Sequence, residues 1–251
     1  MAGTRPEHSP EFSVVVPMKN EAANLTHLVS GIEAACAGRH FEAIFVDDGS
    51  EDGTAEAAAS LGKPWLRLVR HPRSAGQSAA VHSGVLAAQA PLICTIDGDG
   101  QNPPSEIPHM IAPLLGDTPP GLVAGERKGR KDTASKRWAS KFANGLRGWM
   151  LQDGTKDTGC GLKAFRREDF LRMPFFNHMH RYLPALFKAY GLSVQHMPVS
   201  HAERHAGASN YTNFQRALVG IVDLFGVMWL IRRAKRVSPD ETRWPDDRKP
   251  S

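Results

Sequence analysis

The chain contains few cysteines, and their placement excludes two common ways of stabilising a fold. Three cysteines occur among 251 residues, at Cys36, Cys94 and Cys160, and none belongs to a C-x-x-C pair. An odd and scattered set provides neither a disulfide framework nor a zinc site with the usual spacing. This cysteine usage indicates a reducing compartment such as the cytosol.

Long apolar stretches are also missing. Residues 1–10 are polar and contain proline, so they do not resemble a secretory signal, and we expect them to be disordered. The best membrane candidate is the stretch 217–231, in which Asp223 is the only charged residue. As a helix it would extend ~22 Å, which is less than the ~30 Å hydrocarbon core of a bilayer. We therefore expect no membrane-spanning helix.

Several nucleotide-binding and hydrolase signatures are absent as well. No dinucleotide fingerprint follows the first predicted strand, and the chain has neither a P-loop nor a G-x-S-x-G motif. Residues 159–164 match G-x-G-x-x-A, but no clear strand precedes them, so we do not interpret them as a dinucleotide site. These absences exclude the commonest nucleotide-dependent oxidoreductases, P-loop enzymes and α/β-hydrolases.

Apolar runs and helical patterns alternate along the chain. An apolar share of 41 % is sufficient for the core of one compact α/β domain. Strands are expected at residues 12–17, 41–46, 65–69, 91–96 and 121–124, and helices at residues 20–36, 54–61, 76–88 and 103–115. This alternation predicts a mostly parallel sheet with helices on both faces.

Acidic residues gather where the predicted strands end. Asp47 and Asp48 follow one strand, and Asp97 and Asp99 follow another. In parallel α/β sheets, ligands bind beyond the carboxyl ends of the strands. The oxygens of Asp97, Asp99 and Gln101 are hard donors that suit Mg²⁺ or Mn²⁺ bridging a substrate diphosphate. The alternative is an acidic turn that caps the next helix.

Positive charge is concentrated in two windows. Residues 126–147 hold eight lysines and arginines against two acids, and residues 232–236 hold four more cationic side chains. Such clusters indicate an anionic partner, either a phosphorylated substrate or an acidic lipid surface, unless they are merely solvated. No nucleic-acid partner is expected, because the clusters lack an aromatic stacking platform or a recognition motif.

Five motifs in this order resemble those of the inverting family 2 glycosyltransferases of GT-A fold. Three belong to the family at large: VVVPMKNEAANL at 14–25, FVDDGSEDGT at 45–54 and IDGDGQNPP at 96–104. Two more, DTGCGLKAF at 157–165 and RHAGAS at 204–209, resemble the dolichyl- and polyprenyl-phosphate sugar synthase branch. The resemblance covers residues 12–212 and implies a GT-A (nucleotide-diphospho-sugar transferase) domain over residues 11–212.

The resemblance also implies roles for individual residues. Pro17, Lys19 and Glu21 would line the nucleotide pocket of a UDP- or GDP-sugar donor, with Asp48 contacting the base. Asp97, Asp99 and Gln101 would hold Mg²⁺ or Mn²⁺ on the diphosphate. The residues that would face donor or acceptor phosphates are Arg127, Arg137, Ser140 and Arg204. Two departures affect the expected nucleotide and phosphate contacts: many relatives carry lysine in place of Asn210, and an aromatic residue or threonine in place of Lys19.

The chemistry follows from the acceptor. If the acceptor is a polyprenyl phosphate, as the resemblance implies, its second pKa of about 6 makes it mostly a dianion at neutral pH, so it is its own nucleophile. Asp99 would then be catalytic through the metal, and Asp157 is the candidate for orienting the acceptor or the sugar. The alternative for Asp157 is a structural carboxylate that caps a helix or lies at the edge of the core. Transfer to a saccharide or protein hydroxyl would require a general base. A non-catalytic membrane adaptor would not need Asp48, Asp97 and Asp99.

The C-terminal region is expected to contact a membrane without crossing it. Residues 213–236 predict an amphipathic interfacial helix followed by basic residues, and residues 136–151 predict a second amphipathic helix. We therefore expect a cytoplasmic protein bound peripherally to the inner face of the cell membrane, with residues 237–251 disordered. The alternative is that both helices pack on the core or on a second copy in a homo-oligomer.

Overall fold

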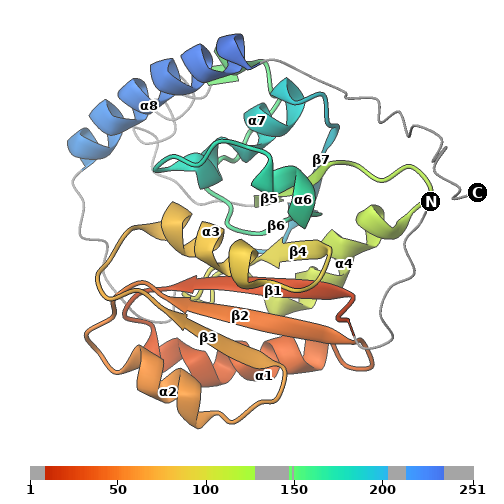
Figure 1. The fold of residues 1–251 in the computed structure, drawn as a ribbon, viewed down its shortest axis with the longest axis vertical. Coiled ribbons are helices and arrows are strands. Elements are labelled where there is room, and N and C mark those ends of the chain that lie inside the picture. The colour runs from red at the N-terminus through yellow and green to blue at the C-terminus, as the bar shows by residue number, and fades with distance from the viewer. Residues whose placement is uncertain (1–8, 128–146, 149, 203–212, 235–251) are drawn as a thin grey trace, which may run out of the picture.

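The described part of the chain folds around one mixed sheet. The computed structural model describes residues 9–127, 147–148, 150–202 and 213–234 (Figure 1). Within these ranges, seven strands hydrogen-bond in the order β3-β2-β1-β4-β6-β5-β7. The strands are β1 (Phe12–Met18), β2 (Phe41–Asp47), β3 (Leu66–Arg70), β4 (Leu92–Thr95), β5 (Leu122–Arg127), β6 (Lys163–Arg166) and β7 (Val194–Val199). All are parallel except β6, so the predicted mostly parallel sheet is confirmed.

Helices connect the strands. The α-helices are α1 (Leu25–Ala35), α2 (Thr54–Ser60), α3 (Gln77–Ala87), α4 (Ile107–Ile111), α6 (Arg167–Leu171), α7 (Leu183–Ala189) and α8 (Asn213–Arg233). Short 3₁₀ turns are η1 (Ala22–Asn24), η2 (Pro104–Glu106), η3 (Ala112–Leu115) and η4 (Met179–Arg181). The residues predicted as one helix over 103–115 form η2, α4 and η3 instead. Pro108 and Pro113 have no N–H to donate and interrupt the helical hydrogen bonds.

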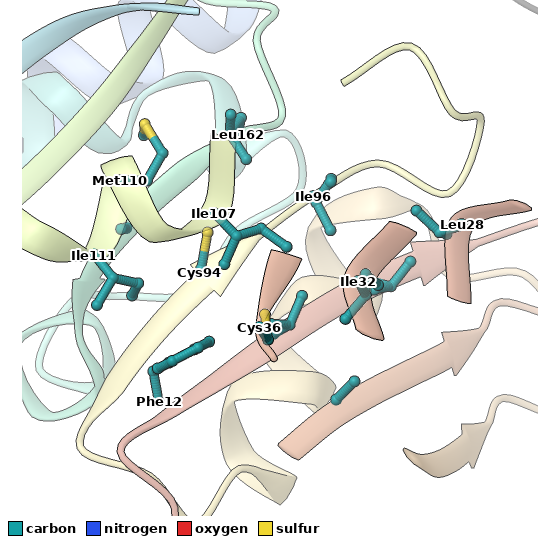
Figure 2. Close-up of a cluster of buried hydrophobic side chains, with 14 of the residues drawn as sticks. Phe12, Leu28, Ile32, Cys36, Cys94, Ile96, Ile107, Met110, Ile111 and Leu162 are labelled. Carbon is teal, nitrogen blue, oxygen red and sulfur yellow. The ribbon is translucent and has the colours of Figure 1, made fainter. Parts of the chain in front are cut away.

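Different helices cover the two faces of the sheet (Figure 1). Helices α1, α2 and α4 pack on one face, and α3, α6 and α7 pack on the other. Neighbouring residues of β1 therefore enter different cores, because side chains alternate along a strand: Val14 packs with α1, and Val15 packs with α3. Figure 2 shows the first core, in which Ile32, Cys94 and Ile107 are fully buried.

Strand β6 was not predicted. It begins at the end of the stretch 159–164 that matches G-x-G-x-x-A, and it pairs antiparallel to β4 in a register that places Lys163 opposite Thr95. A strand of this length gives little periodicity to recognise. Its position matters, because it brings the residues that precede Lys163 to the edge of the sheet where β4 ends.

Helix α8 packs on the body through a small cluster of its own. Its Leu224 and Val227 are buried with Tyr182, and its Asp223 accepts a 2.7 Å contact from the ring of His178. Four apolar residues of α8 are at least half exposed: Ile221, Val222, Phe225 and Trp229. Among the described residues, no helix combines the length and the hydropathy that crossing a membrane requires.

Candidate active site

The acidic residues predicted from sequence lie together at the carboxyl edge of the sheet. Asp48 follows β2, and Asp97 and Asp99 follow β4. Arg127 ends β5, because that strand continues three residues beyond its predicted end at residue 124. Asp97 is close enough to Asp99, Arg127 and Lys163 for their charges to change its pKa. One edge therefore combines carboxylates with two cationic side chains.

Asp97 is held from three sides. Gln77 donates its Nε2 to one carboxylate oxygen at 2.7 Å, and Asn102 donates its Nδ2 to the other at 3.4 Å. The backbone of Gly161 lies so close that a Cβ at this position would collide with the carboxylate. Burial, together with the negative charge of Asp99, raises the pKa of Asp97 to about 6. A divalent cation would favour the charged form of this carboxylate.

The donor set fits Mg²⁺ or Mn²⁺ shared with a substrate. The buried Oδ1 of Asn102 has no hydrogen-bond partner, and it belongs to the side chain that contacts Asp97. Asp99 accepts the backbone N–H of Gln101 at 3.1 Å, which folds these two residues into one turn. Among the described residues, no three histidines, cysteines or acids converge on one point. Such a set matches Mg²⁺, which proteins commonly bind through one or two carboxylates while substrate phosphates supply further oxygens.

Arg127 and Asp157 form an ion pair with each other. The sequence had predicted separate roles for them, one in phosphate binding and one in orienting the acceptor or the sugar. The Nε and Nη2 of Arg127 donate to the two oxygens of Asp157 at 2.7 and 2.8 Å, and each side chain is 14 % exposed. Burial alone would raise the pKa of Asp157, but the hydrogen bonds and charge of Arg127 outweigh it and hold the pKa below its ordinary value. Asp157 is therefore ionised and fixed in the folded protein.

Lys163 is a charged residue of the site that the sequence analysis missed. It is 3 % exposed, and its Nζ donates to the carbonyl oxygen of Cys160. Burial lowers its pKa, while the charges of Asp97 and Asp157 act in the opposite direction. The signal was present in the G-x-G-x-x-A stretch, which contains Lys163. Its Gly161 admits the carboxylate of Asp97, and its lysine supplies a buried cation.

The predicted nucleotide residues occupy the same edge. Pro17 lies near the end of β1, Lys19 is exposed, and Glu21 donates its N–H to Thr54 at 2.9 Å. Asp48 accepts hydrogen bonds from His71, Ser74, Ala75 and Gly76 at 2.7 to 2.8 Å. Burial would raise the pKa of Asp48, but these donors outweigh it and lower the pKa. Asp48 thus shapes the loop that precedes α3, and its contact with a base stays a prediction.

The phosphate residues divide into two groups. Arg127 lies at the edge beside Asp97, where its guanidinium is paired with Asp157, and its contact with a phosphate stays a prediction. Arg137, Ser140 and Arg204 lie outside the described residues, and so does Asn210. Their phosphate contacts stay predictions from the sequence.

Comparison with known proteins identifies the family. Residues 13–173 match the model of glycosyl transferase family 2. The chain belongs to this family. It is 35 % identical over 220 residues to undecaprenyl-phosphate 4-deoxy-4-formamido-L-arabinose transferase of Klebsiella pneumoniae subsp. pneumoniae, covering 85 % of this chain and 66 % of that one. It is 36 % identical over 239 residues to dodecaprenyl-phosphate galacturonate synthase of Rhizobium johnstonii, covering 92 % and 70 %.

These relatives confirm the polyprenyl-phosphate branch that the motifs resemble, although the chain spans only about two thirds of the length of the first. Among solved structures, glucosyl-3-phosphoglycerate synthase from Mycobacterium tuberculosis, in complex with Mn²⁺, UDP and glucosyl-3-phosphoglycerate, has a TM-score of 0.69 at 20 % identity. The match covers 88 % of this chain and 80 % of that one. The same enzyme with Mn²⁺ and UDP-glucose has a TM-score of 0.68 at 22 % identity, covering 87 % and 79 %. The predicted GT-A fold is confirmed.

Proposed function

We propose that this family 2 glycosyltransferase moves one sugar from a UDP- or GDP-sugar to a polyprenyl phosphate at the cytoplasmic face of a membrane. The observation that supports this most directly is the 36 % identity, over 92 % of the chain, to a dodecaprenyl-phosphate galacturonate synthase. A second polyprenyl-phosphate sugar transferase matches 85 % of the chain. The carboxylates at the ends of β2 and β4 are suited to a divalent cation that also binds the phosphates of a nucleoside diphosphate.

Asp97 and Asp99, with Gln101, would hold Mg²⁺ or Mn²⁺ on the donor diphosphate. When bound there, the cation would neutralise the charge that develops on the leaving nucleoside diphosphate. Gln77 and Asn102 each donate to one oxygen of Asp97 and so orient its carboxylate. Lys163 and Arg127 keep positive charge beside the same carboxylate.

The acceptor phosphate would attack the anomeric carbon without a protein base, because its dianion is already the nucleophile. Arg137, Ser140 and Arg204 are proposed to bind this phosphate, since guanidinium groups match phosphate oxygens with two parallel donors. Asp157 would act through Arg127, which it holds in a fixed orientation.

A donor screen tests the proposal. Purified protein would be mixed with vesicles that contain undecaprenyl phosphate, Mn²⁺ and a panel of radiolabelled UDP- and GDP-sugars. We expect label to enter the organic phase with one donor, in a product that mild acid releases as free sugar. Label that reaches only water-soluble products, or no transfer with any donor, would contradict the proposed acceptor.

We also propose that α8 binds the membrane surface through its exposed apolar row, with Arg232 and Arg233 against anionic headgroups. Fully burying a large apolar side chain is worth about 1.5–3 kcal/mol, so Phe225→Glu and Trp229→Glu should each weaken vesicle binding roughly tenfold or more. Sedimentation with vesicles containing phosphatidylglycerol measures this, and raised salt should weaken binding further.

The matched control for this membrane test is Leu86→Glu. Leu86 is a 53 % exposed leucine on α3, whereas Phe225 and Trp229 are 56 % and 60 % exposed on α8. The control variant should sediment with vesicles as the unmodified protein does. Equal binding by all three variants would contradict membrane binding through this apolar row.

A further inference from the structure

The first residue of α3 contacts the carboxylate at the centre of the site. Gln77 donates its Nε2 to Asp97 at 2.7 Å, although its own side chain is largely exposed. An exposed glutamine has many rotamers, and fixing such a side chain costs entropy. The contact is therefore effective only when the start of α3 is itself held in place.

The loop before α3 is held on one side by Asp48. The backbone N–H groups of Ala75 and Gly76 each donate to its carboxylate at 2.8 Å. Gly76 has a φ of +91°, a conformation that residues with a Cβ rarely adopt. The chain thus enters α3 in one direction, which the Asp48 carboxylate sets.

The other side is held by η4, through Ser78. The backbone N–H of His180 donates to the Ser78 hydroxyl oxygen at 3.2 Å, and that hydroxyl lies 2.7 Å from Nδ1 of His180. The hydroxyl can give its hydrogen to Nδ1 while its oxygen accepts the N–H, so both contacts can form together. Burial and the charges of Lys163 and Arg181 keep the pKa of His180 well below its ordinary value, in agreement with a neutral ring.

His180 and Gln77 also share a space with the carboxylate. Both line a cavity of about 10 Å³, together with Asp97 and Lys163. This is about the room that one water molecule occupies. Ser78 follows Gln77 directly in the chain, so its contacts with η4 hold the start of α3 beside the cavity that the Asp97 carboxylate borders.

We propose that Gln77 is a positioning residue for Asp97, and that Ser78 and His180 set the place from which it acts. The proposal rests on the proposed function only in taking Asp97 as a metal ligand. Gln77 fixes one carboxylate oxygen and Asn102 contacts the other, so the orientation of the carboxylate is set before any ligand binds. Residues that touch no substrate would then determine how tightly the cation and nucleotide bind.

The test is a titration of the full chain with Mn²⁺ in the presence of UDP, and separately of GDP, with free Mn²⁺ measured by electron paramagnetic resonance. Losing one hydrogen bond of this kind should weaken Mn²⁺ binding about three- to tenfold in Gln77→Leu and in Ser78→Ala. Ser60→Ala is the control, because Ser60 is exposed on α2 and its hydroxyl donates to the carbonyl oxygen of Ala57 within the same helix. It should bind Mn²⁺ as the unmodified protein does.

A second readout separates positioning from general damage. In sugar transfer by Gln77→Leu, saturating Mn²⁺ should restore kcat, while the Mn²⁺ concentration for half activity rises. Unchanged Mn²⁺ binding in Gln77→Leu would overturn the inference even if the protein transfers sugar. Absence of Mn²⁺ binding with both nucleotides in the unmodified protein would overturn it too. Mn²⁺ binding requires no acceptor, so failure of the donor screen leaves this test intact.

Discussion

Asp99→Asn should weaken Mn²⁺-dependent binding of UDP or GDP about a hundredfold while leaving the fold intact. A contact to a charged group is worth about 1.5–3 kcal/mol, and the substitution removes the charge that the cation would meet. The fold should survive because asparagine has nearly the same shape and keeps an oxygen that can accept the N–H of Gln101. Isothermal titration calorimetry with Mn²⁺ and with EDTA measures the difference.

Asp117→Asn provides the matched control for this metal test. Asp117 is an exposed acid in the loop between η3 and β5, which joins β5 at the end opposite to Arg127. This variant should bind nucleotide as the unmodified protein does, and circular dichroism should confirm that both variants are folded. Nucleotide binding that survives in Asp99→Asn, or that EDTA does not reduce, would contradict a divalent cation on these carboxylates.

The same site should show a pH dependence with a defined direction. The pKa of Asp97 is raised to about 6, so protons compete with the cation below that pH. Mn²⁺ affinity should therefore fall as the pH decreases through about 6 and level off above it. In Asp99→Asn the neighbouring negative charge is gone, so the pKa of Asp97 should be lower. The remaining weak Mn²⁺ binding should therefore start to fall only at a lower pH. Calorimetry between pH 5 and pH 8 would detect both effects.

Much of the fold could be predicted because parallel strands are apolar runs that sequence reveals directly. The ends of β1, β2 and β4 were predicted closely, so Asp48, Asp97 and Asp99 could be placed at one edge. Strand β6 could not be predicted, because four residues that begin with lysine are too few to show an alternation of apolar and polar side chains. Its pairing is set by β4 and β5, which both lie well before it in the sequence. The broken helix at 104–115 was foreseeable from its prolines, but was not predicted.

The surroundings of the carboxylates could not be predicted from local patterns. Gln77 meets Asp97 across 20 residues of sequence, and Ser78 meets His180 across 102. Such contacts depend on how α3 and η4 pack against each other, and no short sequence motif predicts this packing. Arg127 and Asp157 were each found as candidates, yet their mutual contact, across 30 residues, requires the register of β5 and β6.

That pair leads to the largest expected change in stability. Asp157→Ala would leave Arg127 as a cation in a site where each side chain is only 14 % exposed. Breaking a buried ion pair by removing one partner costs about 3–5 kcal/mol. We expect the free energy of unfolding, measured by urea denaturation, to fall by about that amount. Glu33→Ala removes one partner of the solvated pair with Lys63 and should change it little.

A double substitution then separates a folding role from a chemical one. Arg127→Met combined with Asp157→Leu leaves neither member of the pair as an unpaired charge, so it should recover part of the lost stability. The recovery should be incomplete, because the backbone N–H groups of Arg127 and Gly159 lose the carboxylate as their acceptor. If the pair also serves the reaction, this stable variant should transfer sugar at least about tenfold more slowly than the unmodified protein, because the guanidinium beside Asp97 is gone. A double variant that is both stable and fully active would show that Asp157 and Arg127 only hold the end of β5 in place.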